Sequence, residues 1–456
     1  MVPEAVTNAL DANLDAHVEG LCEFLRMPSI ANDPARPDPC RRCAEWLGDQ
    51  MKQMGLSAEV VDAPGKPVVL GSAPAGEADA PTLLIYAHYD VQPPDPLDAW
   101  RTDPFEPVLR DGAIYARGAS DDKGPLWAAL LAVAAWRDAG PLPVNVTFLL
   151  EGEEEIGSPN IDAVVDAHAE RLSADAAVIP DTQFFTADLP SITYGLRGLA
   201  YFELELRGPS EDVHSGLHGG AAANPADALA RLVAALHDET GTVTLDGFYD
   251  AVRPVTDAER AAWRELPFDE AAYAASLGVS ALGGGEAGRG VLERLWARPT
   301  LDANGLVAGY TGEGAKTIIP SRATAKVSCR LVPDQDPQQV VAAFRDFVAA
   351  RTPEGLTADV RVHATARPFL VPLDEPVLRA GREALQEAFG CPPAMIRCGA
   401  SIPVAECIQR TLDLPTALLG CTLPDDNPHA PNEKYALAML RGTAAAIAAL
   451  MGNLAR

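Results

Sequence analysis

The chain is short of positive charge. Its 456 residues include 36 Lys and Arg against 64 Asp and Glu, which gives a formal net charge of −28. Nucleic acids and anionic membrane surfaces are bound through basic patches, so this imbalance argues against both as partners. The sequence also lacks a run of about 18 uncharged apolar residues, which a membrane-spanning helix needs. We therefore expect neither a nucleic-acid nor a membrane partner.

A disulfide framework and a secretory signal are also lacking. Eight cysteines in a chain of this length are too few for a disulfide scaffold. The first 27 residues have no basic segment followed by an apolar one, so we expect no signal peptide. Cys40 and Cys43 form a CxxC pair, but no second ligand pair follows at the spacing of a zinc site. These features predict free thiols and a cytoplasmic location.

What the chain does have is enough apolar material for a large core. Hydrophobic residues make up 48% of it, and its length suggests two or three domains. Up to about residue 195, short apolar runs at 82–87, 144–150 and 176–180 alternate with helical patterns, including a buried helix at 124–137. This alternation predicts an α/β domain with a mixed, largely parallel sheet.

The pattern changes after residue 197. A strand at 199–206 alternates apolar and polar residues, and a helix starts at Pro225. Strands near 305–310 and at 323–331, a helix at 337–350 and a strand at 357–363 complete a βαββαβ order, which is ferredoxin-like. Residues 245–298 look like a helical insertion without an assigned role. We expect an α/β domain of residues 1–197 and 368–456, with an α+β domain of residues 198–367 inserted into it.

Acidic or imidazole side chains follow four separate predicted strands, the three named above and one at 416–419: His88 and Asp90, Glu154 and Glu155, Asp181, and His429. Asp121 precedes the helix at 124–137. In open α/β sheets, sites form outside the carboxyl ends of the strands. Carboxylates gathered at such an edge repel one another unless cations intervene. The placement therefore predicts a metal site.

The residue types point to hydrolytic metal chemistry. Two histidines and three carboxylates suit Zn²⁺ or Mn²⁺. One carboxylate that bridges two metals, with one histidine and one further carboxylate on each, leaves open positions where water is activated and a carbonyl is polarised. The water needs a base, and an unligated Glu154 beside a ligating Glu155 would serve.

Eight strings carry a family resemblance, in family order, between about residues 80 and 435: YAHYDVQP, DGAIYARGASDDKGP, EGEEEIGSPN, PDT, DVHSGLHGG, GAKTIIPSRATAKVSCRLVPDQ, GASIPV and HAPNEK. The chain resembles the carnosine dipeptidase branch of the co-catalytic zinc metallopeptidases. That superfamily also holds carboxypeptidase G, aminoacylase-type and desuccinylase-type enzymes. The resemblance covers most of the chain.

The resemblance implies two divalent metal ions per subunit, zinc first and manganese second. His88 and Asp181 would ligate one ion, Glu155 and His429 the other, and Asp121 would bridge them. 

It also implies the roles of residues around the ions. Asp90 would accept a hydrogen bond from the second ring nitrogen of His88. Glu154 would act as general acid and base. The peptide bond between Asp121 and Asp122 is expected to be cis, as in relatives.

For the inserted domain, the resemblance implies a lid that also forms a homodimer. His214 would reach into the partner subunit's active site and polarise the scissile carbonyl, with support from Thr317. Arg330 and Ser401 would bind the substrate carboxylate, which suits the planar guanidinium group. This chain departs from the family at His363. Dipeptidase-like relatives have a histidine before a Lys-Pro pair, and His363 lies about one residue out of that position.

The expected activity is cleavage of the peptide bond in dipeptides or short peptides. In the resemblance, an aspartate at the position of Asp181 goes with aminopeptidase and dipeptidase members, and a glutamate with carboxypeptidase and acylase members. The alternative is an N-acyl amino acid deacylase, because the same centre attacks any planar amide carbonyl. A more remote alternative is a catalytically inactive binding protein.

Overall fold

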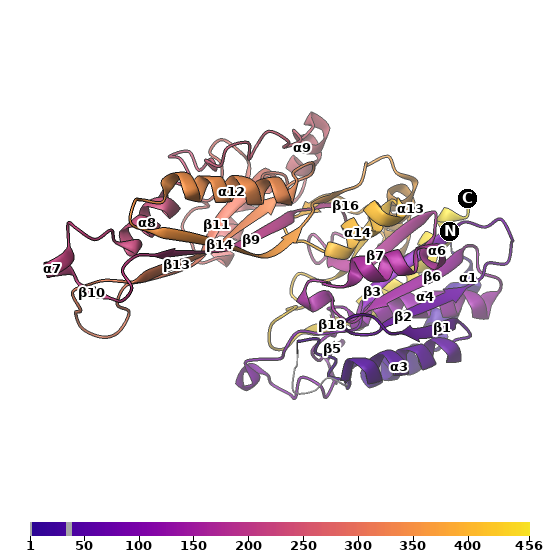
Figure 1. Cartoon of the computed structure of the whole chain (residues 1–456). Coiled ribbons are helices and arrows are strands. Elements are labelled where there is room, and N and C mark those ends of the chain that lie inside the picture. Colours follow the sequence, from indigo (N-terminus) through magenta and orange to yellow (C-terminus); the bar gives the residue numbers. More distant parts are fainter. Residues whose placement is uncertain (1, 33–38) are drawn as a thin grey trace. The chain divides into compact units, whose positions relative to one another are not determined.

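The computed structural model describes residues 2–32 and 39–456, which form two compact units (Figure 1). Unit 1 comprises Met1–Tyr194, Val371–Ile396 and Ile402–Arg456. Unit 2 comprises Gly195–Leu370 and Arg397–Ser401. The segment predicted as an inserted domain, residues 198–367, lies within unit 2.

Unit 1 is built on a mixed sheet in the order β1-β2-β6-β3-β7-β17-β8, with β16 pairing to β8. The strands are β1 (Ser57–Val61), β2 (Val68–Ala73), β3 (Thr82–His88), β6 (Asn145–Glu151), β7 (Ala176–Gln183), β8 (Ser191–Leu196), β16 (Ala394–Cys398) and β17 (Thr416–Thr422). Its centre is parallel, because β3 pairs in parallel with β6 and β7, and β7 with β17. β1, β2 and β8 add antiparallel pairings on either side. The predicted α/β class with a largely parallel sheet is confirmed.

The helices of unit 1 follow from their apolar faces. They are α1 (Glu4–Ala12), α2 (Leu14–Leu25), α3 (Pro39–Gln53), α4 (Lys123–Ala139), α5 (Ile161–Ala167), α6 (Ala169–Leu172), α13 (Pro376–Phe389), α14 (Pro403–Leu412) and α15 (Leu437–Leu454). The helix α4 is buried along most of its length, as its continuous apolar sequence predicts. A small sheet of β18 (Lys434–Ala436), β5 (Ala113–Tyr115) and β4 (Val108–Arg110) completes the unit.

Among the described residues, α15 is the one helix long and apolar enough to cross a membrane. Of its 18 residues, 61% are buried, and it packs against α4 and α13. Its single charged side chain, Arg441, forms an ion pair with Asp11. The packing is that of a core helix of a folded domain.

Unit 2 contains a four-stranded antiparallel sheet in the order β11-β13-β9-β14. Its elements follow one another along the chain as β9 (Gly198–Arg207), α8 (Pro225–Ala234), β11 (Thr300–Ala308), β13 (Arg322–Leu331), α12 (Pro337–Arg351) and β14 (Thr357–Ala366). Asn224 and Asp336 cap the two helices, each followed by a proline in the first turn. This βαββαβ order confirms the ferredoxin-like prediction.

The remaining elements of unit 2 are short. They are β10 (Val213–His214), α7 (Ser215–His218), α9 (Asp257–Arg264), α10 (Glu270–Ser276), α11 (Val291–Trp296), β12 (Ile318–Ile319) and β15 (Phe369–Leu370). The predicted helical insertion at 245–298 thus consists of α9, α10 and α11 with their connecting loops. All eight cysteines lie in the described part of the chain and are free, with Cys40 and Cys43 buried on α3.

The core of unit 2 depends on aromatic packing between α12 and β9. The Phe344 ring is fully buried and stacks on Phe202, with ring centroids 4.4 Å apart. We expect Phe344→Ala to destabilise the protein by about 3–5 kcal/mol through lost burial and the cavity left behind. The exposed neighbour Arg345 offers a control on the same helix, and Arg345→Ala should stay within about 0.5 kcal/mol. Guanidinium unfolding of the two variants compares these costs; equal midpoints would contradict the prediction.

Candidate metal centre

The candidate ligands lie where the parallel strands of unit 1 end. β3 ends at His88, and β6 leads through Glu151 into a short 3₁₀ helix, Glu154–Ile156. Asp181 lies near the end of β7. Because β6 and β7 are both parallel neighbours of β3, their carboxyl ends meet at one edge of the sheet. Asp121, just before α4, and His429, in the loop between β17 and β18, complete the cluster.

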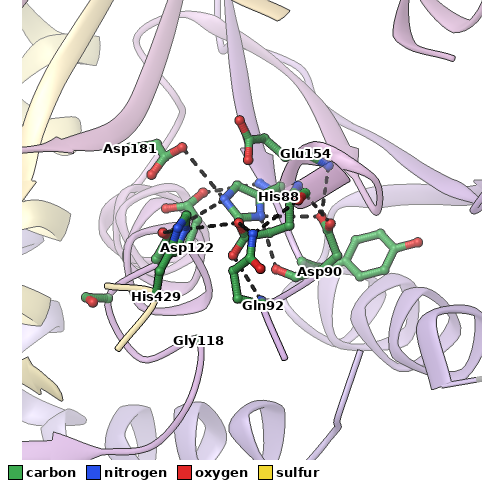
Figure 2. A network of polar contacts seen from close by, with 12 residues as sticks. His88, Asp90, Gln92, Gly118, Asp122, Glu154, Asp181 and His429 are labelled. Carbon is green, nitrogen blue, oxygen red and sulfur yellow. Dashed lines mark hydrogen bonds and ion pairs between the residues drawn. The ribbon is translucent and has the colours of Figure 1, made fainter. Parts of the chain in front are cut away.

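Two groups of three side chains could each hold a metal ion. The first group is His88, Asp121 and Asp181, and in each group the ligand atoms lie within 4.8 Å of one another. His88 Nε2 lies 3.1 Å from Asp121 Oδ1 and 3.7 Å from Asp181 Oδ2. Figure 2 shows His88 at the centre of these contacts. The His88 side chain is fully buried.

The second group is Asp121, Glu155 and His429. His429 Nε2 lies 2.8 Å from Asp121 Oδ2 and 3.0 Å from Glu155 Oε2. The two carboxylate oxygens of Asp121 therefore face different imidazoles. That is the arrangement expected of a carboxylate shared between two ligand groups.

The electrostatics of the cluster fit bound cations. Burial raises the pKa of Asp181 well above its usual range, and the nearby carboxylates of Asp122 and Asp121 raise it further. Burial opposes ionisation of Asp121 as well, but hydrogen bonds with His429 and His88 lower its pKa below the usual range. Crowded carboxylates are stabilised in their charged form by positive charge. The mixed nitrogen and oxygen donors suit a divalent ion such as Zn²⁺ or Mn²⁺.

His88 Nδ1 faces both the main chain and the side chain of Asp90. His88 Nδ1 lies 3.1 Å from the backbone carbonyl oxygen of Asp90, and 3.4 Å from its carboxylate. The carboxylate accepts hydrogen bonds from the backbone N–H groups of Glu154 and Glu155, at 3.2 and 3.0 Å. The carbonyl and the carboxylate of Asp90 therefore both lie near the His88 ring, and the carboxylate also fixes the turn with Glu154.

Glu154 lies beside both groups and has the environment of a proton carrier. Burial raises its pKa to about 7, and the charges of Asp121 and Glu155 act in the same direction, while His88 opposes them. A general base works best when its pKa lies near the working pH. The peptide bond between Asp121 and Asp122 is cis, as expected.

Three further residues support the cluster and were not among the site residues predicted from the sequence. Gln92 donates from Nε2 to Glu155 Oε2 at 2.8 Å and from its backbone N–H to Oε1 at 3.0 Å. The backbone N–H of His88 donates to Asp122 Oδ2 at 3.1 Å. Glu433 binds the loop that leads to Asp121. All three lie in the strings YAHYDVQP, DGAIYARGASDDKGP and HAPNEK. Their closeness in sequence to the predicted ligands is the feature that could have identified them.

The other predicted site residues belong to unit 2. His214 pairs with Ile318 in the two-stranded sheet β10–β12, next to Thr317, whose carbonyl accepts the N–H of Ser215. The His214 side chain is exposed, and its Nδ1 accepts the N–H of Gly216 at 2.9 Å. The structure thus places His214 on β10 and Thr317 just before the partner strand β12.

Arg330 and Ser401 also lie together in unit 2. Arg330 Nη1 donates to Ser401 Oγ at 3.1 Å, and Ser401 Oγ donates to the carbonyl of Arg197. His363, the irregular position, is 3.3 Å from a carboxylate oxygen of Glu203 and lies beside the Tyr201 ring. The His363 side chain therefore contacts two residues of β9 in the sheet of unit 2.

Comparisons with known proteins agree with this geometry. The model of peptidase family M20/M25/M40 matches residues 84–453. A Beta-Ala-His dipeptidase from Homo sapiens is 32% identical over 90% of this chain and 81% of its own length. A Cys-Gly metallodipeptidase from Schizosaccharomyces pombe is 30% identical over 94% of this chain and 93% of its own. The structure of an M20 family metallo-carboxypeptidase from Sulfolobus solfataricus superposes with a TM-score of 0.87 at 32% identity, covering 96% of this chain and 99% of that one. The chain is therefore a metallopeptidase and belongs to peptidase family M20/M25/M40.

Proposed function

We propose that the chain hydrolyses the peptide bond of dipeptides with two divalent metal ions bound at the cluster. The observation that carries this proposal is the pair of ligand groups that share Asp121, with Glu154 beside them. His88 and Asp181 would hold one ion, and Glu155 and His429 the other. Relatives named as dipeptidases, at 30–32% identity over most of the chain, support the substrate class.

Each residue then has a defined task. Divalent ions bound there supply Lewis-acid charge that polarises the scissile carbonyl and lowers the pKa of water. Glu154 takes a proton from the attacking water and delivers it to the leaving amine. Asp90 holds the His88 ring by its carbonyl and holds the backbone of Glu154 by its carboxylate. The base is thereby fixed relative to the ligands.

Activity on a substrate panel, after reconstitution of the purified chain with Zn²⁺ or Mn²⁺, tests the function. We expect turnover of unblocked dipeptides. Turnover restricted to N-acetyl or N-succinyl amino acids would instead establish the deacylase alternative. Binding of these compounds without turnover under either metal would favour the inactive binding protein.

A carboxypeptidase is a second candidate, favoured by the superposition on the metallo-carboxypeptidase. The two activities differ in substrate length, because a dipeptidase requires a free amino group next to the scissile bond. Comparing a dipeptide with its N-benzyloxycarbonyl derivative and with a tetrapeptide separates them. Release of the C-terminal residue from the longer or blocked compounds would support the carboxypeptidase.

We further propose that Arg330 and Ser401 bind the substrate's terminal carboxylate. Their side chains are hydrogen-bonded to each other, and no carboxylate partner of Arg330 is found among the described residues. Arg330→Gln should raise KM for a dipeptide free acid about 10- to 100-fold, since a charge-assisted hydrogen bond contributes roughly 1.5–3 kcal/mol. Hydrolysis of the corresponding dipeptide amide is the control and should change little. An equal loss on acid and amide would contradict the carboxylate role.

Unit 2 would serve as the lid and the dimerisation domain, and His214 would act in the partner's active site as a donor to the developing oxyanion. Its exposed side chain and its place beside Thr317 support this proposal. His214→Ala should lower kcat about 10²–10³-fold, the usual cost of one oxyanion donor.

Mixing two inactive variants tests the trans role. Subunits of His214→Ala and of Glu154→Gln, allowed to exchange at equal amounts, should recover about a quarter of wild-type activity, because half of the dimers are mixed and each has one complete site. Each variant alone, taken through the same exchange, is the control. A mixture no more active than its components would show that His214 serves its own subunit.

We also propose a cytoplasmic location. It is supported by the eight free cysteines, because reducing compartments keep thiols unpaired.

A further inference from the structure

Glu433 is a fully buried carboxylate to which the proposed reaction gives no task. It lies four residues after His429, in the loop between β17 and β18. A buried charge is costly unless it is paired and hydrogen-bonded. Its partners therefore indicate what it stabilises.

Within residues 2–32 and 39–456, the hydrogen-bond donors to the Glu433 carboxylate come from one short segment, residues 117–121. Oε2 accepts from Arg117 Nη1 at 2.7 Å and from the backbone N–H of Gly118 at 2.8 Å. Oε1 accepts from the backbone N–H and the hydroxyl of Ser120, at 2.8 and 3.0 Å, and from the N–H of Asp121 at 3.1 Å. Five donors thus converge on one carboxylate, and the last of them belongs to the shared ligand.

The loop that carries Glu433 is itself held firmly. Asp426 accepts from the backbone N–H of Leu423 at 2.7 Å and from Lys434 Nζ at 3.2 Å. The strand β18, which starts at Lys434, pairs with β5, and the carbonyl of Glu433 accepts the N–H of Ala116. Segment 117–121 and the His429 loop are therefore joined by main-chain pairing and by the Glu433 carboxylate.

The consequence concerns the distance between two candidate ligands. His429 Nε2 lies 2.8 Å from Asp121 Oδ2, although 308 positions separate them in the sequence. An outer partner that orients a ligand typically changes metal affinity or activity 10- to 100-fold when it is removed. Glu433 binds the backbone of Asp121 and shares a loop with His429, so it fixes both ends of this contact.

We propose that Glu433 is a positioning residue that sets the bridging carboxylate of Asp121 against His429, and so couples the two metal sites. The inference rests on the proposed function, because it assumes that Asp121 is a shared ligand. The glutamate would touch neither substrate nor metal. Its effect would pass through the N–H groups that hold Asp121 in place.

Glu433→Gln tests this role with little change in shape. A glutamine offers one acceptor oxygen and turns its amide NH₂ toward N–H donors that the carboxylate now satisfies. Calorimetric titration of the metal-free full-length variant with Zn²⁺ should show both sites weakened by roughly 10- to 100-fold. Affinities within about threefold of wild type would overturn the proposal.

Arg117→Met is the matched control for a merely structural role. It removes the buried ion pair but leaves the carboxylate its four donors from Gly118, Ser120 and Asp121. We expect this variant to unfold at a lower temperature and to keep its metal affinity. If it weakens metal binding as much as Glu433→Gln, the effect is general destabilisation and the proposal fails.

The double variant Arg117→Met with Glu433→Gln covers a failure of the single variant to fold, because it leaves no unpaired buried charge. It should bind metal as weakly as Glu433→Gln. Asp121→Asn separates this inference from the proposed function. If Asp121→Asn leaves both metal affinities intact, the metal centre itself is wrongly assigned. If it abolishes binding while the Glu433 variants bind normally, only the positioning role is refuted.

Discussion

Glu154→Gln is expected to lower kcat for dipeptide hydrolysis by about 10³-fold, within the range of 10²–10⁴ that a general acid or base contributes. The substituted amide keeps the size of the side chain but cannot accept the proton of the attacking water. The metal ligands are untouched, so the variant should retain its full metal content. Steady-state kinetics together with elemental analysis of the same preparation measures both quantities.

The neighbouring Glu153 provides the control for this variant. It lies in the same run of glutamates but points elsewhere, since its carboxylate accepts a hydrogen bond from Asn160 Nδ2 at 2.7 Å. Glu153→Gln should therefore keep kcat within a few-fold of wild type. Unchanged turnover in Glu154→Gln, at intact metal content, would show that another group moves the proton.

The central strands of the unit 1 sheet, β3, β6, β7 and β17, were predictable because they are largely buried and therefore form continuous apolar runs. The position of the candidate ligands followed from the same pattern: His88 and Asp181 come where such runs end, and parallel strands end at one edge. The ferredoxin-like order of unit 2 could be derived from the alternation in β9 and the proline-marked starts of α8 and α12.

The contacts that hold the ligands in place could not be derived in this way. Asp90 was expected to bind His88 by its carboxylate, yet its carbonyl lies nearer and its carboxylate binds the N–H groups of Glu154 and Glu155. Glu433 binds main-chain groups more than 300 positions away. Backbone N–H groups are the same at every residue except proline, so the sequence carries no sign of where they point.

The assignment of one short segment to unit 2 likewise has no sign in the sequence. Residues Arg397–Ser401 belong to unit 2, although α/β elements of unit 1 precede and follow them. Arg197 holds this segment, with its backbone N–H on the carbonyl of Ala400 and its Nε on the carbonyl of Gly399. These are again hydrogen bonds to main-chain carbonyls, which leave no periodic pattern in the sequence.

Asp121→Asn and Asp181→Asn are expected to differ in the number of metal ions that they lose. Asp121 belongs to both ligand groups, whereas Asp181 belongs only to the group of His88. An asparagine is neutral and has one oxygen donor, so it cannot bridge two cations as a carboxylate does. Asp121→Asn should therefore retain close to no metal after dialysis, and Asp181→Asn about one ion per chain, because its second ligand group of Asp121, Glu155 and His429 is intact.

Elemental analysis after dialysis against metal-free buffer counts the ions, and calorimetric titration with Zn²⁺ gives their affinities. Both variants should lose more than about 100-fold in kcat/KM, because one ion alone leaves the second half of the site incomplete. This loss exceeds the 10- to 100-fold that removal of a residue hydrogen-bonded to a ligand typically causes. Thermal unfolding of the metal-free proteins shows whether each variant is folded. The two variants separate a shared ligand from two independent sites: one ion retained in both would mean that Asp121 serves a single metal, and the bridging role would be lost.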